Sequence, residues 1–133
     1  MASERKIKVL LTKSDQDCHD RGIRFIARHM RDSGMEVIIH RYPIVDEAIS
    51  AAEQEDVDII AFSFFGSGLM YDMGRTMELL KEKDMTDIPV IVGGTLVKDE
   101  RDKLLEMGVA EAFLPNVGSI QDIIDCIKSL VKK

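Results

Sequence analysis

The chain has 133 residues, 45% of them hydrophobic, and carries a formal net charge of -6 at pH 7. This length predicts one domain over residues 1–133, and the acidic balance argues against nucleic acid and anionic membrane surfaces, which require basic surface. No apolar run approaches the roughly 18 residues of a membrane span, and no apolar signal segment precedes the first predicted strand, so we expect a cytoplasmic protein.

Short apolar runs alternate with helical patterns, five of each, which is typical of βα units that build a parallel sheet. The first strand is predicted at residues 7–11. The helix after it should run close to residues 20–33, because apolar residues recur there at helical spacing and Gly34 stands where a left-handed cap is expected. Later strands, of which the last should be a short edge strand, are predicted at residues 37–39, 57–62, 88–92 and 110–114.

Apolar faces indicate the four remaining helices. Their apolar positions are Val45, Ala48, Ile49 and Ala52; Leu69, Met73, Met77 and Leu80; Leu104 and Leu105; and Ile120, Ile123, Ile124, Ile127, Leu130 and Val131. Gly108 should end the fourth helix, and Ser119 with Asp122 forms a capping-box pattern before the fifth. Cys18 and Cys126 lie far apart in the sequence, which indicates neither a disulfide framework nor a zinc site.

A polar stretch, residues 13–22, connects the first strand to the first helix, and in parallel sheets ligands bind where such loops project. Asp17 and His19 are two residues apart, so in an extended backbone they point the same way and the carboxylate can accept a ring N–H. A carboxylate behind an imidazole is typical of a metal-bound histidine, and Lys13 would keep that carboxylate ionised. The alternative is that His19 is a solvated surface residue.

Two residues at the helix end of this loop have local explanations. Asp20 can cap the orphan amides of the first helix. Gly22 allows the backbone or a ligand to come close where a side chain would obstruct. The alternative is that Gly22 only relaxes a turn.

Two further loops follow predicted buried strands. The first, residues 63–68, contains Ser63, Phe65 and Gly66; ordinary packing is an alternative to ligand contact for its phenylalanine side chains. The second begins with Gly93 and Gly94, which permit close approach by a flat ligand or form a tight turn.

Taken together, Asp17-x-His19-x-x-Gly22, Ser63-x-Phe65 and Gly93-Gly94 resemble the D-x-H-x-x-G, S-x-L and G-G motifs of cobalamin-binding domains. Lys13-x-x-x-Asp17-x-His19-Asp20-Arg21-Gly22 is most similar to the small subunit, or C-terminal domain, of methylmalonyl-CoA mutase and related acyl-CoA mutases. The resemblance spans nearly the entire chain. The expected fold class is α/β, a three-layer, flavodoxin-like (Rossmann-like), doubly wound five-stranded parallel sheet with strand order 2-1-3-4-5.

The resemblance implies that the chain binds cobalamin base-off, with His19 replacing the dimethylbenzimidazole base on cobalt. It implies that Ser63 hydrogen-bonds a nitrogen of the displaced base, that Phe65 lines the base pocket where leucine is usual, and that the pair Gly93-Gly94 flanks the nucleotide tail. The implied cofactor-binding residues are Lys13, Asp17, His19, Asp20, Arg21, Gly22, Ser63, Phe65, Gly66, Gly93, Gly94 and Pro115. The sequence also departs from the family pattern at Asp15, at Leu69 and over residues 115–119, which bears on the nucleotide tail and not on the cobalt ligand.

The resemblance further implies an adenosylcobalamin-dependent carbon-skeleton rearrangement. This chain would be the cofactor-binding subunit, inactive alone, and a separate large TIM-barrel subunit would bind the acyl-CoA. No residue of this chain is assigned as acid, base or radical relay.

Four other functions are alternatives. A corrinoid carrier for methyl transfer would share the motif but usually has a helical bundle before it, and a cobalamin storage or delivery protein would also share it. A signalling receiver would need an aspartate at the end of the third strand, where Ser63 stands. An FMN-binding flavodoxin would need a hydroxyl-rich phosphate loop, whereas residues 13–22 are mainly acidic.

Overall fold

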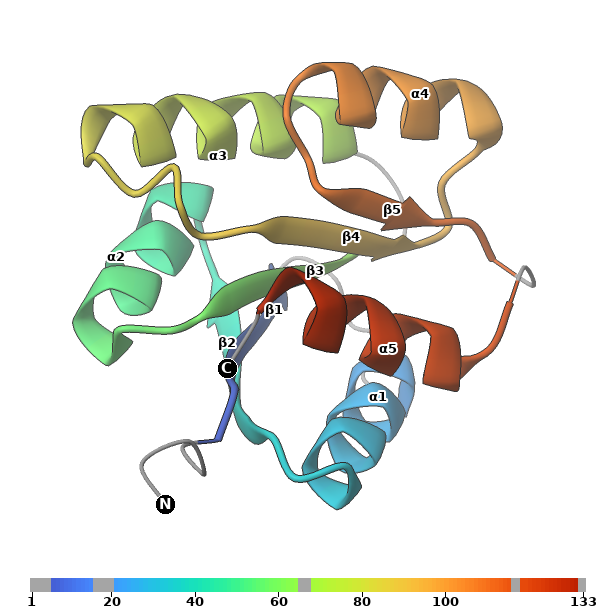
Figure 1. Ribbon diagram of the computed structural model, residues 1–133. Coiled ribbons are helices and arrows are strands. Elements are labelled where there is room, and N and C mark those ends of the chain that lie inside the picture. The colour runs from blue at the N-terminus through green and yellow to red at the C-terminus, as the bar shows by residue number, and fades with distance from the viewer. Residues whose placement is uncertain (1–5, 16–20, 65–67, 116–117, 132–133) are drawn as a thin grey trace.

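The computed structural model describes residues 6–15, 21–64, 68–115 and 118–131. Within these ranges it contains one sheet whose strands are all parallel, in the order β2-β1-β3-β4-β5 (Figure 1), as the sequence predicted. The strands are β1 (Lys8–Ser14), β2 (Glu36–Tyr42), β3 (Ile59–Phe64), β4 (Val90–Gly94) and β5 (Glu111–Phe113).

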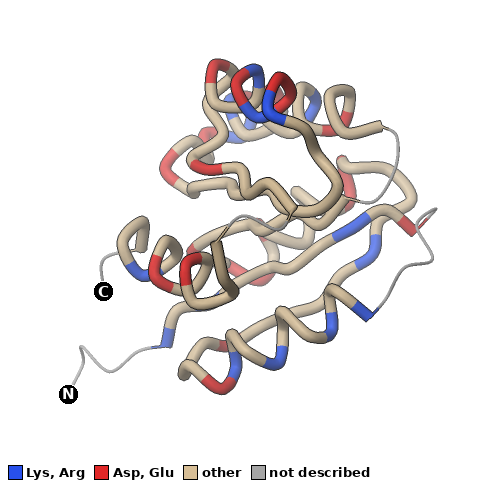
Figure 2. The backbone as a smooth tube through the Cα atoms, turned by 90° about the vertical axis from the view of Figure 1, so that its right-hand side faces the viewer, with Lys and Arg blue, Asp and Glu red and all other residues tan. Residues whose placement is uncertain are grey.

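Helices cover both faces of the sheet. One face carries α1 (Arg21–Asp32) and α5 (Ile120–Leu130), and the other carries α2 (Val45–Glu55), α3 (Leu69–Glu82) and α4 (Lys98–Glu106) (Figure 1). This division follows from right-handed crossovers, because the chain moves outward from β1 to β2 and then reverses direction across the sheet toward β5. Figure 2 shows a row of basic residues along α1, in an otherwise acidic chain.

The two faces of the sheet hold two separate apolar clusters. In β1, Val9 and Leu11 pack under α1 and α5, whereas Leu10 packs under α2 and α3. The six residues of β3 are buried, as expected for a central strand covered on both sides. Alternation along each strand therefore decides which helices a side chain meets.

The predicted helix ends are largely confirmed. Gly34 has φ +92°, and the N–H of the next residue, Met35, donates to the carbonyl of Met30 at 3.1 Å, which closes α1. At the start of α5, the Ser119 N–H donates to the Asp122 carboxylate at 2.8 Å.

The predicted strand boundaries were wrong at several ends. Lys13, Ser63, Gly93 and Gly94, expected in loops, lie inside β1, β3 and β4. Their strands continue past the apolar runs because a neighbouring strand supplies hydrogen bonds there, as in the pairing of Phe64 with Gly94. A ladder of this kind needs no apolar side chain, so composition did not reveal it.

Two strands, β3 and β4, also begin two residues later than predicted. The Val57 N–H donates to the Ala52 carbonyl at 3.2 Å and so closes α2 instead of starting β3. Similarly, the Ile88 N–H donates to the Met85 carbonyl at 3.1 Å in a turn before β4. Both apolar side chains face the core from turns, which gives them a strand-like sequence signal.

Candidate functional site

An apolar cavity of about 160 Å³ lies between the sheet and helices α1 and α5. Gly22, Ser63, Gly93 and Gly94, four of the residues implied as cofactor-binding by the sequence, line it. The other lining residues are apolar: Leu11, Ile26, Met30, Ala61, Phe62, Ile91, Val92, Phe113 and Ile123. An apolar cavity of about 150 Å³ can hold benzene, so this one has room for an aromatic ring.

Ser63 places a hydroxyl in these apolar surroundings. It alternates with Ala61 on β3 and pairs in register with Gly93 on β4, and only 8% of its surface is exposed. Among the residues that the structure describes, the Ser63 hydroxyl has no hydrogen-bond partner. The buried hydroxyls of Thr12 and Thr76, by contrast, lie 3.3 Å from the His40 ring and 2.8 Å from the Asp72 carbonyl. A buried hydroxyl without a partner is costly, so a ligand with a polar ring atom would satisfy it.

The two adjacent glycines are required for different reasons. A Cβ on Gly94 would collide with the carbonyl oxygen of Phe64, and Gly94 has φ +126°, so the backbone itself demands glycine. A Cβ on Gly93 would lie 4.0 Å from the nearest atom, the Cβ of Phe113, which is ordinary contact. Gly93 therefore leaves room in the cavity that the fold does not need, and this room suits a flat ligand.

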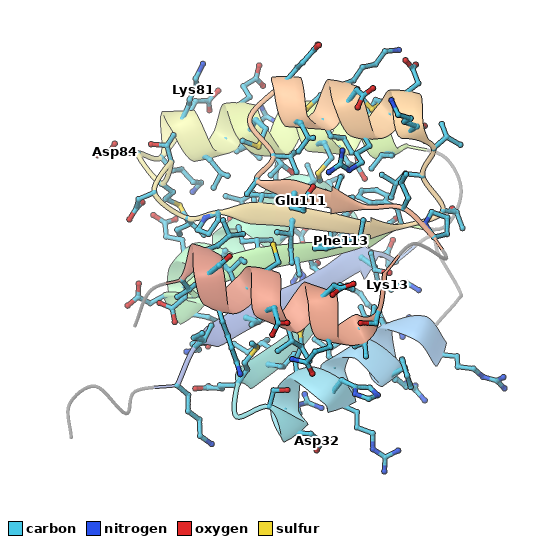
Figure 3. All side chains as sticks on the ribbon, turned by 45° about the vertical axis from the view of Figure 1, so that its right-hand side comes forward. Lys13, Asp32, Lys81, Asp84, Glu111 and Phe113 are labelled. Atoms are coloured by element: carbon cyan, nitrogen blue, oxygen red, sulfur yellow. The ribbon has the colours of Figure 1, made fainter. Side chains whose placement is uncertain are left out.

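Lys13 lies one residue before the end of β1 and is 0% exposed. It alternates with Leu11, which lines the cavity, so it belongs to the α1 and α5 face of the sheet. Figure 3 shows it at the end of the sheet from which the loop to α1 departs. A buried ammonium group requires a polar or charged partner, which fits the predicted pairing with a carboxylate.

The remaining predicted residues are dispersed or lie outside the described ranges. Arg21 is exposed at the start of α1, and Pro115 is exposed after β5. Five others, including the predicted cobalt ligand, lie outside the described residues: Asp17, His19, Asp20, Phe65 and Gly66.

A second, larger hollow was not predicted from the sequence. It has a volume of about 1020 Å³ and lies between the start of α2 and the first turns of α3, on the opposite face of the sheet. We call it the α2–α3 groove. Its lining residues are Ser14, Tyr42, Pro43, Ile44, Val45, Asp46, Gly68, Met70, Tyr71, Asp72, Gly74, Arg75 and Glu78.

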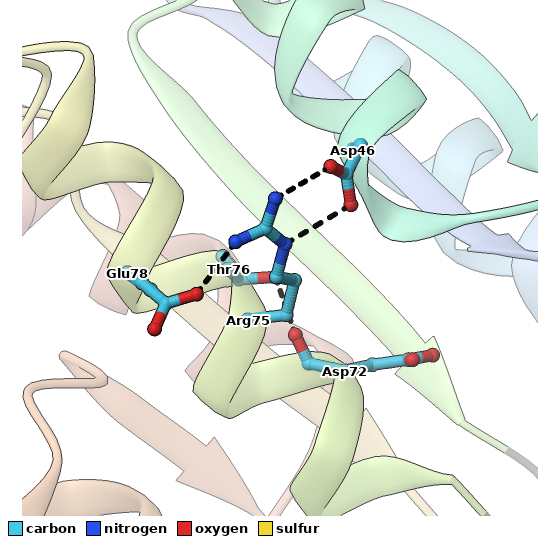
Figure 4. Close-up of polar contacts among 5 residues, drawn as sticks. All are labelled: Asp46, Asp72, Arg75, Thr76 and Glu78. Carbon is cyan, nitrogen blue, oxygen red and sulfur yellow. Dashed lines mark hydrogen bonds and ion pairs between the residues drawn. The ribbon is translucent and has the colours of Figure 1, made fainter.

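Two polar contacts join the helices of the α2–α3 groove to their surroundings. The Arg75 guanidinium donates to both carboxylate oxygens of Asp46, at 2.8 and 3.3 Å, and to Glu78 at 2.6 Å (Figure 4). The buried Tyr42 hydroxyl donates to the Asp72 carboxylate at 2.9 Å. The contacts of Arg75 with Asp46 and of Tyr42 with Asp72 join residues about 30 positions apart, so no local sequence pattern could have revealed them.

The surroundings of the groove side chains shift the pKa values of Asp46, Asp72 and Arg75. The hydrogen bonds from Arg75 hold the pKa of Asp46 below its usual value, and those to Asp46 and Glu78 raise the pKa of Arg75. Burial raises the pKa of Asp72, and the Tyr42 hydroxyl partly offsets that rise.

In residues 6–15, 21–64, 68–115 and 118–131, no three His, Cys, Asp or Glu side chains gather where they would hold a metal ion. No helix in the same ranges is long and apolar enough to cross a membrane.

Comparison with known proteins gives a consistent picture. Residues 7–118 match the B12 binding domain family. The chain is 38% identical over 128 residues to the 2-hydroxyisobutanoyl-CoA mutase small subunit of Aquincola tertiaricarbonis, covering 94% of this chain and 92% of that one. It is 33% identical to the pivalyl-CoA mutase small subunit of Xanthobacter autotrophicus, covering 99% and 88% of the two chains. It is also 35% identical to the methylmalonyl-CoA mutase of Rhizobium meliloti, of which it spans 16%.

Solved structures share the fold. A cobalamin-binding protein from Desulfitobacterium hafniense matches with a TM-score of 0.79 and 21% identity, over 96% of this chain and 60% of that one. The receiver domain of a Francisella response regulator matches with a TM-score of 0.73 and 20% identity, over 96% and 98%. These likenesses concern the fold alone, and β3 here contains no aspartate. The match over residues 7–118 decides the family: the chain belongs to the B12 binding domain family.

Proposed function

We propose that the chain is the cobalamin-binding small subunit of an adenosylcobalamin-dependent acyl-CoA carbon-skeleton mutase. The observation that carries this proposal is the buried Ser63 hydroxyl, which has no partner among the described residues and faces an apolar cavity beside Gly93. The similarity to two mutase small subunits, along nearly the full length of each, supports the same assignment.

The cavity would receive the displaced benzimidazole of the nucleotide tail. In this arrangement the Ser63 hydroxyl donates to a ring nitrogen, while Gly22 and Gly93 give the tail clearance on either side. Phe65 and Gly66 follow directly on β3, and Pro115 follows β5, so we place them around the rim of the tail site. The apolar walls exclude water, which strengthens the single hydrogen bond from serine.

His19 would ligate cobalt from the loop that leaves β1. Asp17 would accept the other ring N–H and fix the tautomer, and the buried Lys13 would hold that carboxylate ionised. Arg21 begins α1, Asp20 precedes it in the sequence, and both would fix the end of this loop. Adenosylcobalamin supplies radical chemistry when bound, and the residues of this chain bind, orient and shield it.

A separate large subunit would bind the acyl-CoA. Two relatives that the chain matches along nearly their full length are both small subunits of acyl-CoA mutases, which supports a separate catalytic partner. In the methylmalonyl-CoA mutase of Rhizobium meliloti, the matching region is 16% of a longer chain, which suits a cofactor module attached to a larger catalytic part.

Absorbance spectroscopy of the purified protein with adenosylcobalamin tests the proposal. We expect a base-off, histidine-ligated spectrum that is lost in His19→Ala and retained in His29→Ala, a matched control on α1. Ser63→Ala should keep the histidine-ligated spectrum but bind about 10-fold more weakly. Its melting temperature before cofactor is added should be no lower than that of wild type, because the change removes no hydrogen bond that the described residues make. A wild-type protein that leaves the spectrum of the cofactor unchanged would refute the proposal.

A further inference from the structure

The α2–α3 groove opens at the carboxyl ends of the strands, the same end of the sheet from which the predicted cofactor-binding stretch, residues 13–22, leaves β1. Ser14 at the end of β1 and Tyr42 at the end of β2 form its inner wall, and the first turns of α3 form its outer wall. The cavity that contains Ser63 lies on the other face of the sheet. A partner that covers the carboxyl ends of the strands would therefore reach the groove without extending along the helices on either face of the sheet.

Two large apolar side chains border the groove and remain in contact with solvent. Ile44, directly before α2, is 58% exposed, and Tyr71, in the first turn of α3, is 77% exposed. Single exposed apolar residues are ordinary, but here both flank one hollow. A tyrosine that is exposed on a free subunit is also a residue type enriched at the centres of protein interfaces.

Gly74 is the third and most informative feature of the groove. It lies inside α3, where glycine is less favourable than alanine, and its φ is not in the left-handed region. A Cβ built on Gly74 meets no atom within 4 Å in the part of the chain that the structure describes. Neither backbone geometry nor internal packing therefore requires glycine, whereas an approaching partner backbone would.

The charges of the groove indicate the chemistry of its occupant. Asp46, Asp72 and Glu78 line it together with one cation, Arg75, whose guanidinium already donates to Asp46 and Glu78. The lining is therefore acidic overall. An apolar side chain flanked by lysine or arginine would match both the exposed apolar residues and the excess negative charge.

Building on the proposed function, we propose that the α2–α3 groove is a docking site for the mutase large subunit. The large subunit inserts an apolar side chain with a basic neighbour between Ile44 and Tyr71, close against Gly74. The same contact would hold the carboxyl ends of the strands of the small subunit toward the acyl-CoA site of the large subunit. Gly74 then lowers the stability of the free subunit but allows the backbone of the partner to approach α3 closely.

Isothermal titration calorimetry tests the proposal, with the large subunit of the same mutase titrated into cobalamin-loaded small subunit. Gly74→Ala should raise the melting temperature of the small subunit by about 3 °C, because alanine favours helix, yet weaken association about 10-fold. Tyr71→Ala should weaken association by a similar factor. Phe25→Ala, a matched control on α1 that removes a side chain 54% exposed, should change neither.

The outcomes separate this proposal from the proposed function. If all variants bind cobalamin and the large subunit as the wild type does, the groove is not the docking site, although the proposed function stands. If the wild-type protein binds neither cobalamin nor the large subunit, both proposals fail. Sedimentation of the small subunit alone supplies the last comparison, because self-association that Gly74→Ala abolishes would identify a second copy as the occupant and overturn the proposal.

Discussion

At the scale of single residues, identical side chains have different roles according to what surrounds them. Gly93 and Gly94 are neighbours in β4, yet a Cβ on Gly94 collides with the backbone of β3, whereas a Cβ on Gly93 enters the cavity. Ser63 and Thr12 form a second such pair. Both hydroxyls are buried, but that of Thr12 contacts the His40 ring, whereas that of Ser63 has no partner among the described residues. Side chains and free space that the fold itself does not use, as at Ser63 and Gly93, are therefore the basis on which we propose the binding site.

Substitution of the two glycines tests this distinction. Gly94→Ala should lower the melting temperature strongly, because the new methyl group cannot avoid the Phe64 carbonyl. Gly93→Ala should leave the melting temperature of the cofactor-free protein within about 2 °C of wild type but weaken cobalamin binding about 10-fold or more. Thermal denaturation and spectroscopic titration measure the two effects. A Gly93→Ala protein with wild-type affinity would show that the tail does not pass this residue.

At the scale of secondary-structure elements, Arg75 joins α3 to the first turn of α2. Its bidentate contact with Asp46 links two helices that pack on the same face of the sheet (Figure 4). The side chains of Arg75 and Asp46 are 33% and 39% exposed, so solvent screens the contact and its main effect is on the relative position of the helices. The width of the α2–α3 groove depends on that position.

The pKa of Asp46 predicts how this contact responds to pH. Because Arg75 lowers the pKa of Asp46 in the folded protein, its stabilising effect is complete above the unfolded value of about 3.8 and is lost as the pH falls through the lower folded value. Arg75→Met should therefore reduce the melting temperature by a few degrees at most at pH 7, and the difference from wild type should shrink below pH 4.

Thermal denaturation of wild type and Arg75→Met across this pH range provides the measurement. Asp72 titrates with the opposite sign, because burial raises its pKa, but it is present in both proteins and its effect largely cancels in the difference. Asp46→Asn should behave like Arg75→Met, and the double variant should be no less stable than either. A difference that persists unchanged at pH 3 would assign the effect to packing of the arginine stem.

At the scale of the whole molecule, one sheet separates two binding regions. Helices α1 and α5 enclose the cavity on one face, whereas α2 and α3 form the groove on the other, and both regions reach the carboxyl ends of the strands. In the proposed complex, the nucleotide tail of the cofactor fills the cavity and an apolar side chain of the large subunit enters the groove. The small subunit would then act as a rigid connector between them.

Cofactor binding should stabilise the whole domain. At a cobalamin concentration 100 times the dissociation constant, linkage adds about 2.7 kcal/mol, which corresponds to a rise of about 10 °C in melting temperature for a domain of this size. Cobinamide, which lacks the nucleotide tail, cannot fill the cavity and should stabilise much less. Differential scanning fluorimetry measures both, and equal stabilisation by the two compounds would exclude the cavity as the tail site.

The alternation of apolar runs and helical patterns by itself determined most of the fold. Five βα units, their succession along the chain and the predicted cap at Gly34 all follow from local patterns, because helix and strand periodicities are local properties, whereas the strand order in the sheet was expected from the family resemblance. The same holds for the order of the cobalamin motifs along the chain. The ends of β1, β3 and β4 were predicted too early because hydrogen bonding to a neighbouring strand, and not composition, extends them.

Only the tertiary structure decided which of these residues meet. Strand register places Ser63 beside Gly93, and sheet alternation assigns both to the face under α1 and α5. The contact of Arg75 with Asp46 and the vacant space above Gly74 depend on how α2 and α3 pack, which no local pattern encodes. Side-chain chemistry is written in the sequence, but proximity between distant residues arises from the packing of the whole chain.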